Sequence, residues 1–269
     1  MKFGLCNEMF VDWPFDKAFA FTRECGYTGI ELAPFTMGSD AYSIPSEKRA
    51  EVRQQAEASD LQVIGLHWLL AKTEGYYLTS PDAAIRKKTA DYIAELARLC
   101  RDVGGDLMVL GSPQQRNLLP GVTHDDAMKY AADVLAQAVP TFEEQKVTLA
   151  IEPLGPAEGD FLNTAALGAQ LMDMVDSPLV RLHLDVKAMS TEAVDIPTII
   201  EQNRDRTAHF HANDPNLLGP GMGDVDFAPI FAALKESGYD GWVSVEVFDY
   251  EPGPEYIAKV SMENMLKHV

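Results

Sequence analysis

Four polar residues stand at the ends of short apolar runs in the second half of the chain, where a buried strand has no packing use for them: Glu152, Asp185, His211 and Glu246. Pro153 follows Glu152 and ends its strand, because proline lacks the backbone N–H that a sheet ladder needs. Carboxylates held together without a cation repel and raise one another's pKa, whereas a divalent cation relieves the repulsion and also binds imidazole. We therefore predict that these four residues hold a divalent metal.

The donor types narrow the choice of ion. Three carboxylates with a single imidazole favour Mn²⁺, with Mg²⁺ and Co²⁺ as alternatives, over a structural zinc. The cysteines, Cys6, Cys25 and Cys100, are odd in number, widely spaced and without a CxxC motif. They indicate buried thiols, because neither a disulfide framework nor a structural zinc site has this spacing.

Further residues near predicted strand ends are candidates for substrate contacts: His67, Trp68, Arg116, Glu158, His183 and Lys187. The indole of Trp68 suits either the apolar face of a sugar ring or packing under a loop. Arg116 could hold a substrate oxygen or pair with surface acids, and Glu158 could fold back over the site or face solvent. His209 precedes His211 by two residues and points the same way from a strand, which suits either support of a metal ligand or a place in the core.

The elements that must position these residues alternate along the chain. Eight short aliphatic runs predict strands at 3–6, 29–33, 62–68, 106–111, 147–152, 181–185, 207–212 and 242–247. Longer amphipathic runs predict helices at 15–25, 46–59, 82–103, 125–145, 164–175, 195–203, 227–237 and 254–267. This alternation is typical of parallel βα units and predicts a (β/α)₈ TIM barrel formed by residues 1–269 as one domain.

Polar residues also mark several predicted helix starts. Side-chain oxygens that could cap a helix stand at four of these starts, in the segments Pro45-Ser46, Ser80-Pro81-Asp82, Thr123-His124-Asp125 and Asn163-Thr164. In a parallel barrel the active site gathers at the carboxyl ends of the strands. The predicted barrel therefore brings Glu152, Asp185, His211 and Glu246 to one rim.

Charge and hydropathy exclude several classes of function. The net charge of −19 would repel a phosphate backbone, and the 41 acidic residues are spread along the chain, so neither nucleic acid nor an anionic membrane is an expected partner. A strand-like run begins at once after Met1, which leaves no room for a signal peptide, and no apolar run approaches a membrane span. We expect a cytoplasmic protein that binds a small molecule.

In order and spacing, four motifs resemble the xylose isomerase-like barrel family of sugar isomerases and epimerases, in particular the D-tagatose and D-psicose 3-epimerases. They are IEP ending at Pro153, LD at Asp185, the HxH run from His209 followed by Asp214 and PGxG up to Gly223, and SVEV around Glu246. The resemblance implies metal ligation by the four residues above and proton transfer by Glu152 and Glu246. It also implies that Glu158 assists at the substrate carbonyl and that the protein forms a homo-dimer or homo-tetramer.

Two positions depart from the ketohexose epimerases. Those enzymes typically carry a histidine and an arginine where this chain has Ala188 and Leu217, so Lys187 or His183 takes over part of the task or the substrate differs. The resemblance implies a metal-dependent epimerase or isomerase that moves a proton next to the carbonyl of a ketose or keto-sugar through an enediolate. The alternatives are a lyase or dehydratase acting on a keto-inositol or 3-keto-sugar, and a noncatalytic sugar-binding subunit.

Overall fold

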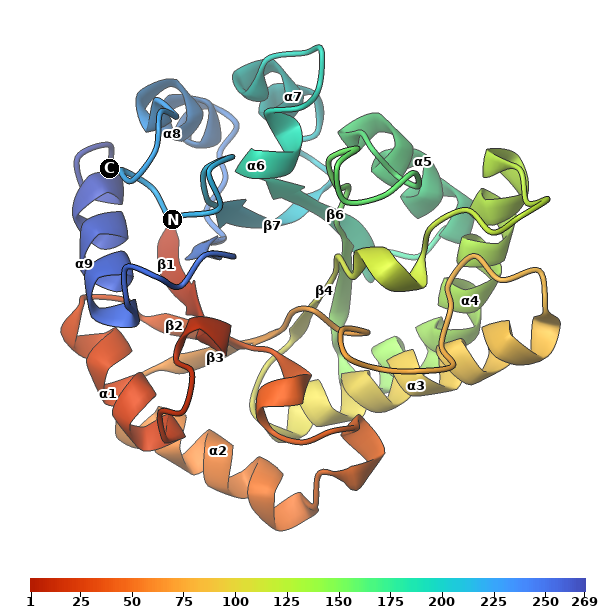
Figure 1. Ribbon diagram of the computed structural model, residues 1–269, viewed down its shortest axis with the longest axis horizontal. Coiled ribbons are helices and arrows are strands. Elements are labelled where there is room, and N and C mark those ends of the chain that lie inside the picture. Colours follow the sequence, from red (N-terminus) through yellow and green to blue (C-terminus); the bar gives the residue numbers. More distant parts are fainter.

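Eight parallel strands close into a barrel in the computed structural model, which describes residues 1–269 (Figure 1). The strands follow the chain order around the barrel, and β1 pairs with β8 to close it. They are β1 Lys2–Cys6, β2 Gly29–Leu32, β3 Gln62–Leu66, β4 Leu107–Leu110, β5 Thr148–Ile151, β6 Val180–Asp185, β7 Thr207–Ala212 and β8 Trp242–Val245. The predicted (β/α)₈ barrel is confirmed.

Helices surround the strands on the outside of the barrel (Figure 1). They are α1 Phe15–Glu24, α2 Ser46–Ala58, α3 Ala83–Asp102, α4 His124–Gln145, α5 Ala165–Val175, α6 Val186–Met189, α7 Ile196–Gln202, α8 Phe227–Glu236 and α9 Pro254–Met265. Helix α6 was not predicted, because four residues are too few to show a periodicity. Four single-turn 3₁₀ helices, η1 Asn7–Met9, η2 Pro34–Thr36, η3 Ala41–Ser43 and η4 Pro113–Gln115, lie in the loops.

Three of the four predicted helix caps are correct. Asp82, Thr123 and Thr164 accept hydrogen bonds from backbone N–H groups in the first turns of α3, α4 and α5. Ser46 is not a cap: it is already the first helical residue, and the N-cap of α2 is Pro45, which has no side-chain oxygen to offer.

Two strands, β3 and β8, end two residues earlier than predicted, and both ends matter for the site. Strand β3 stops at Leu66, and Trp68 beyond it has a φ of 52°, a left-handed conformation that cannot continue a strand. Strand β8 stops at Val245, so Glu246 is the first residue after it. Trp68 and Glu246 therefore belong to the loops that follow β3 and β8, and not to the hydrogen-bonded strands.

The inside of the barrel is apolar in one part and polar in another. A cluster of Ile64, Leu107, Val109, Ala150 and Trp242 forms a small core separate from the large one between strands and helices. It lies inside the barrel, because a Cβ added to the strand glycine at position 29 would meet Ile64 and Trp242. The barrel also encloses completely buried histidines on β6 and β7, which belong to the functional site.

The glycine-rich loop from Pro215 to Gly223 is folded into turns. The Asp214 carboxylate accepts hydrogen bonds from the backbone N–H groups of Asn216 at 3.3 Å and Val225 at 2.9 Å, and so ties both ends of the loop together. No helix in the structure has the length and apolar character to cross a membrane.

Candidate active site

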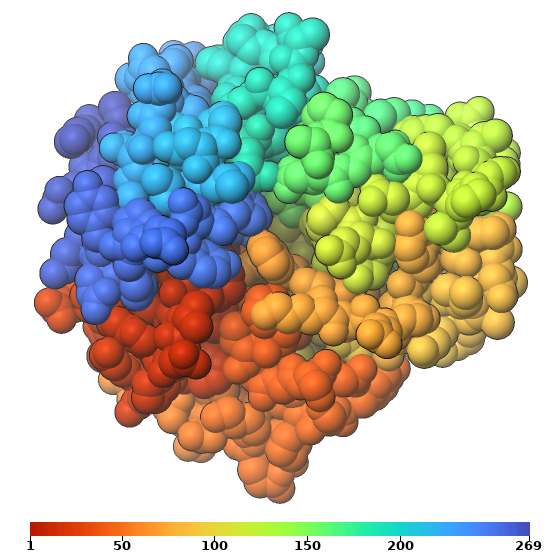
Figure 2. Space-filling view, in the orientation of Figure 1, coloured from red at the N-terminus to blue at the C-terminus, as the bar shows by residue number.

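A cleft of about 370 Å³ opens among the loops that follow β3, β4, β5 and β8. Figure 2 shows this face hollowed near its centre, where the segments around residues 70, 115, 155 and 248 meet. Two of the predicted metal ligands, Glu152 and Glu246, line the cleft together with Trp68 and Glu158. A site of this kind at the carboxyl ends of the strands is the usual place for chemistry in a parallel barrel.

The four predicted metal ligands are all buried and adjoin one another. Single donor atoms of Glu152, Asp185 and His211 lie within 4.8 Å of one another. Glu246 joins the group through His211, whose Nδ1 lies 3.1 Å from Glu246 Oε2. Space for Glu152 depends on Gly111, because a Cβ there would overlap Glu152 Oε2.

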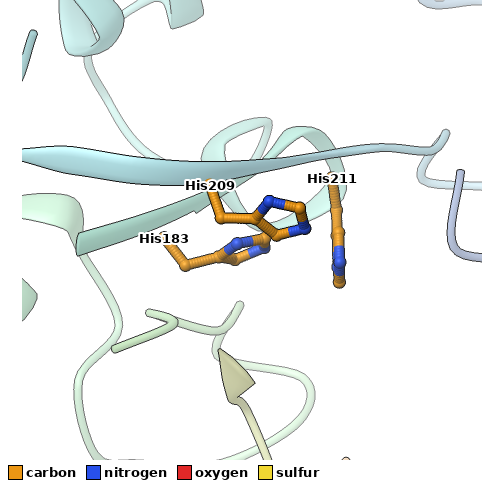
Figure 3. Close-up of side chains that lie close together, drawn as sticks. All are labelled: His183, His209 and His211. Atoms are coloured by element: carbon orange, nitrogen blue, oxygen red, sulfur yellow. The ribbon is translucent and has the colours of Figure 1, made fainter. Parts of the chain in front are cut away.

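His183 belongs to the same group of donors. Figure 3 shows its imidazole beside those of His209 and His211, and its ring centroid lies 4.2 Å from that of His211. Neither ring nitrogen of His183 has a hydrogen-bond partner, and Nε2 lies 3.8 Å from Glu152 Oε1. Burial, together with the neighbouring His211 and His209, lowers the pKa of His183 well below its ordinary value. A neutral imidazole of this kind is able to donate a lone pair to a cation.

Glu31 is a residue that the sequence analysis missed. It lies on β2, is completely buried, and its Oε1 lies 2.6 Å from His209 Nε2. Both of its oxygens also lie 3.2–3.3 Å from His211 Nε2. A carboxylate beside Nε2 accepts a hydrogen bond from that nitrogen and fixes the ring so that Nδ1 of His211 faces Glu246. The available signal was an acid inside the buried run Gly29–Leu32.

Trp68 both lines the cleft and fixes Glu246. Its indole Nε1 donates a hydrogen bond of 2.6 Å to Glu246 Oε1. Its ring stacks on that of Phe248, with centroids 5.9 Å apart and planes 23° from parallel. Each oxygen of Glu246 therefore has its own partner, Trp68 for Oε1 and His211 for Oε2.

Of the predicted substrate contacts, only Trp68 and Glu158 line the cleft. Lys187 lies behind Glu158, with Nζ 2.7 Å from Glu158 Oε1, and Glu158 Oε2 accepts the backbone N–H of Gly155. Arg116 is buried, and its Nη1 donates 2.7 Å to the backbone carbonyl of Glu152. Arg116 and Lys187 therefore hold the loop after β5, which carries Glu152 and Glu158.

His67 is also absent from the cleft wall. It is completely buried, and its Nε2 lies 2.6 Å from Glu8 Oε2. The donor atoms of His67, Glu8 and Glu246 lie within 4.8 Å of one another. His67 therefore lies beside Glu246, in contact with a second buried acid.

Ala188 and Leu217, where ketohexose epimerases typically carry a histidine and an arginine, have different surroundings in this structure. Ala188 lies in α6, where its backbone N–H donates a hydrogen bond of 2.7 Å to the carboxylate of Asp185, the N-cap of that helix. Leu217 has a φ of 73° and is 43% exposed, and its carbonyl accepts the N–H groups of Phe248 and Asp249. Neither position lines the cleft of Glu152 and Glu246.

The electrostatic environments of the two cleft glutamates differ. Burial, followed by the charges of Glu246 and Asp185, raises the pKa of Glu152 well above its ordinary value. Burial also raises the pKa of Asp185, to about 6. Burial acts in the same direction on Glu246, but the charge of His211 and the hydrogen bonds from His211 and Trp68 hold the pKa of Glu246 below its ordinary value. The pKa values of the two cleft glutamates are therefore shifted in opposite directions.

These residues fit a divalent cation. Three carboxylates and one imidazole, whose Nδ1 faces Glu246, are donors that Mn²⁺, Mg²⁺ and Co²⁺ accept, and His183 adds two buried nitrogens without a hydrogen-bond partner. Burial is the main cause of the raised pKa values of Glu152 and Asp185, and the charge of Glu246 raises both further, so a bound cation would stabilise their charged forms.

The pKa values predict how metal binding depends on pH. A group with a raised pKa keeps its proton up to that pKa, and a carboxylate must lose the proton to ligate a metal. Affinity for Mn²⁺ is therefore expected to rise with pH, and to fall as the pH drops through about 6, the pKa of Asp185. The slope is about tenfold per pH unit for each proton displaced. Isothermal titration with Mn²⁺ at a series of pH values measures it, and a flat profile contradicts the assignment of Asp185.

The chain matches known proteins over nearly its whole length. Residues 19–268 match the family described as xylose isomerase-like TIM barrel. A probable ketose 3-epimerase of Synechocystis is 29% identical over 244 residues, 88% of this chain and 79% of the relative. A D-psicose 3-epimerase of Enterocloster bolteae is 27% identical over 262 residues, 94% of this chain and 84% of the relative.

A solved structure agrees with the fold. The D-allulose 3-epimerase of Methylomonas in complex with D-allulose superposes with a TM-score of 0.84 at 21% identity, covering 100% of this chain and 97% of that one. At this identity the likeness supports the barrel itself.

Proposed function

This chain belongs to the xylose isomerase-like TIM barrel family, and on that premise we propose that it is a divalent-metal-dependent epimerase or isomerase of a ketose or keto-sugar. Its relatives carry the names of sugar 3-epimerases, which are isomerase-class enzymes. The observation that carries the proposal is the pair Glu152 and Glu246 in one cleft, beside a set of donors that suits a divalent cation.

The two glutamates suit proton transfer in both directions. They follow β5 and β8, which are not neighbours in the barrel, so they reach the cleft from different sides. One glutamate removes the proton next to the carbonyl, and the other returns a proton on the opposite face of the carbon, which inverts it. Return of the proton to the neighbouring carbon gives aldose–ketose isomerisation instead. Opposed pKa directions are typical of such acid and base pairs.

We assign Glu152, Asp185, His211 and Glu246 as the metal ligands, with Mn²⁺ as the expected ion. When bound, the cation would supply Lewis-acid stabilisation of the charge that develops on the substrate oxygens. Trp68 holds Glu246 in place through its indole N–H. Glu158 lines the cleft and pairs with Lys187, and we propose that it assists at the carbonyl side of the substrate. We further expect a cytoplasmic homo-dimer or homo-tetramer.

Solvent deuterium tests the reaction. Incubation with D-fructose, D-psicose, D-tagatose and L-ribulose in D₂O with Mn²⁺ is expected to place deuterium on a carbon next to the carbonyl of at least one sugar. Nuclear magnetic resonance identifies the labelled carbon and the epimer formed. Loss of water without deuterium in recovered sugar points to a lyase. No exchange with any of the four sugars, in protein shown to bind Mn²⁺, contradicts the proposal.

A further inference from the structure

A second cleft lies on the other side of Trp68 from the cleft of the two glutamates. Its volume is about 620 Å³, and it is formed by η1 and the loop after it, η2, α1 and Tyr250. The two clefts share Trp68 and Lys72 in their walls. Both volumes lie within the range of roughly 300–1,000 Å³ that is usual for small-molecule sites. The proton-transfer mechanism uses only the smaller one.

The wall of the second cleft is rich in aromatic side chains. Trp13, Phe35 and Tyr250 are half-buried there. Phe35 packs against Trp68 with ring centroids 5.9 Å apart, and Trp13 packs against Phe10 at 5.3 Å. Aromatic rings held in this way present flat, slightly negative faces that suit the C–H face of a pyranose ring.

The same wall contains an acid with an unused oxygen. Glu8 is 5% exposed, and its Oε2 is engaged by His67, while its Oε1 has no hydrogen-bond partner. A buried carboxylate oxygen without a donor is costly, and a ligand hydroxyl is one group that relieves the cost. Glu8 also lies beside Glu246, since their donor atoms and that of His67 fall within 4.8 Å. It therefore stands where the two clefts adjoin.

The charges of the wall disfavour an anionic occupant. Glu8 and Asp12 contribute two carboxylates and Lys72 a single ammonium, which already lies 3.9 Å over the Phe35 ring. Aromatic faces combined with a free acceptor and little positive charge suit a neutral, hydroxyl-rich ring. A purely apolar group would leave the free oxygen of Glu8 without a donor.

We propose that the second cleft binds a glycosyl residue attached to the reacting sugar, so that the preferred substrate is a glycosylated ketose rather than a free one. The inference rests on the proposed function for the chemistry in the first cleft. The bond between the two sugar units would then pass near Glu8 and Glu246, where the clefts adjoin, and Trp68 would line the site of each unit.

Disaccharides that contain D-fructose test this directly. The probes are D-fructose and its O4-, O5- and O6-glucosyl derivatives, maltulose, leucrose and isomaltulose, each with Mn²⁺ present. At least one disaccharide is expected to bind about tenfold or more tightly than D-fructose in isothermal titration. It is also expected to show a deuterium-exchange kcat/KM higher by a similar factor.

Two variants connect the preference to the cleft. Trp13→Ala is expected to lower the protein's affinity for the disaccharide far more than its affinity for D-fructose. The disaccharide would then no longer bind more tightly than D-fructose. Phe35→Leu keeps most of the apolar volume but removes an aromatic face of the second cleft. It is the variant to use for the same test if Trp13→Ala does not fold. Tyr256→Ala, which changes a 56% exposed tyrosine on α9 that lines neither cleft, is the matched control and should retain the preference.

The outcomes separate the two proposals. If D-fructose exchanges deuterium but no disaccharide binds more tightly, the glycosyl cleft is wrong and the proposed reaction stands. If a disaccharide binds more tightly and Trp13→Ala or Phe35→Leu abolishes this preference, the glycosyl cleft is supported even if no sugar exchanges. A preference that survives both variants also overturns it, because the extra affinity then arises elsewhere.

Discussion

Glu152→Gln and Glu246→Gln are each expected to abolish epimerisation, lowering kcat by about 10³-fold or more. Loss of a single acid–base group costs roughly 10²- to 10⁴-fold, and each of these residues is also a proposed metal ligand. Inversion needs one group on each face of the carbon, so a single remaining glutamate cannot complete it. The rate of appearance of the second epimer, followed by chromatography with saturating Mn²⁺, measures the effect.

The two variants should differ in what they retain. Each keeps the glutamate that serves one face, so each is expected to exchange deuterium slowly into one epimer and not into the other, with opposite preferences. Glu143→Gln, on the exposed surface of α4, is the control and should behave as the unaltered protein. Metal content measured on every variant separates lost acid–base chemistry from lost metal. Undiminished epimerisation by either variant with metal bound would falsify the assignment of the pair.

Glu31→Gln is expected to weaken Mn²⁺ binding by about 10- to 100-fold, which is typical for loss of a carboxylate that supports a histidine ligand. The amide removes the charge that Glu31 holds against His211 Nε2 at 3.2 Å and His209 Nε2 at 2.6 Å. It also offers an N–H where an acceptor is needed, so the His211 ring loses its fixed orientation. Isothermal titration with Mn²⁺ measures the change without reference to turnover.

Glu95→Gln is the control for Glu31→Gln, because it alters another largely buried pair, with Arg49 at 2.8 Å, that belongs to none of the groups of possible metal donors. Its Mn²⁺ affinity should change much less. Excess Mn²⁺ is expected to restore kcat in Glu31→Gln, whereas a variant that is merely misfolded would not recover. Equal affinity losses in both variants would show that Glu31 has no special connection to the metal site.

The sequence was sufficient for the barrel because its elements are local. Strand ladders and amphipathic helices leave periodic patterns within a few residues, and Asp82, Thr123 and Thr164 mark helix starts through hydrogen bonds to the next turn. A charge that ends an apolar run is equally visible, which is why Glu152 and Glu246 could be predicted to share a rim. The parallel order of the strands then placed them on the same side of the molecule.

The partners of those residues depended on closure of the barrel. Glu31 and His211 are 180 positions apart, and Trp68 and Glu246 are 178 apart. No local pattern records such a contact, since it arises only when strands from both halves of the chain face one interior. The same closure turned His67 toward Glu8 and placed Lys187 and Arg116 behind the cleft wall.

The sequence by itself therefore determined the (β/α)₈ fold and the acids and histidine placed at its strand ends. The tertiary structure alone decided which side chains face one another, and so revealed Glu31, the bond from Trp68 to Glu246 and the second cleft beside them. The physical reason is that strand and helix formation depend on neighbours along the chain, whereas the direction of a side chain inside a closed barrel depends on register and packing across it.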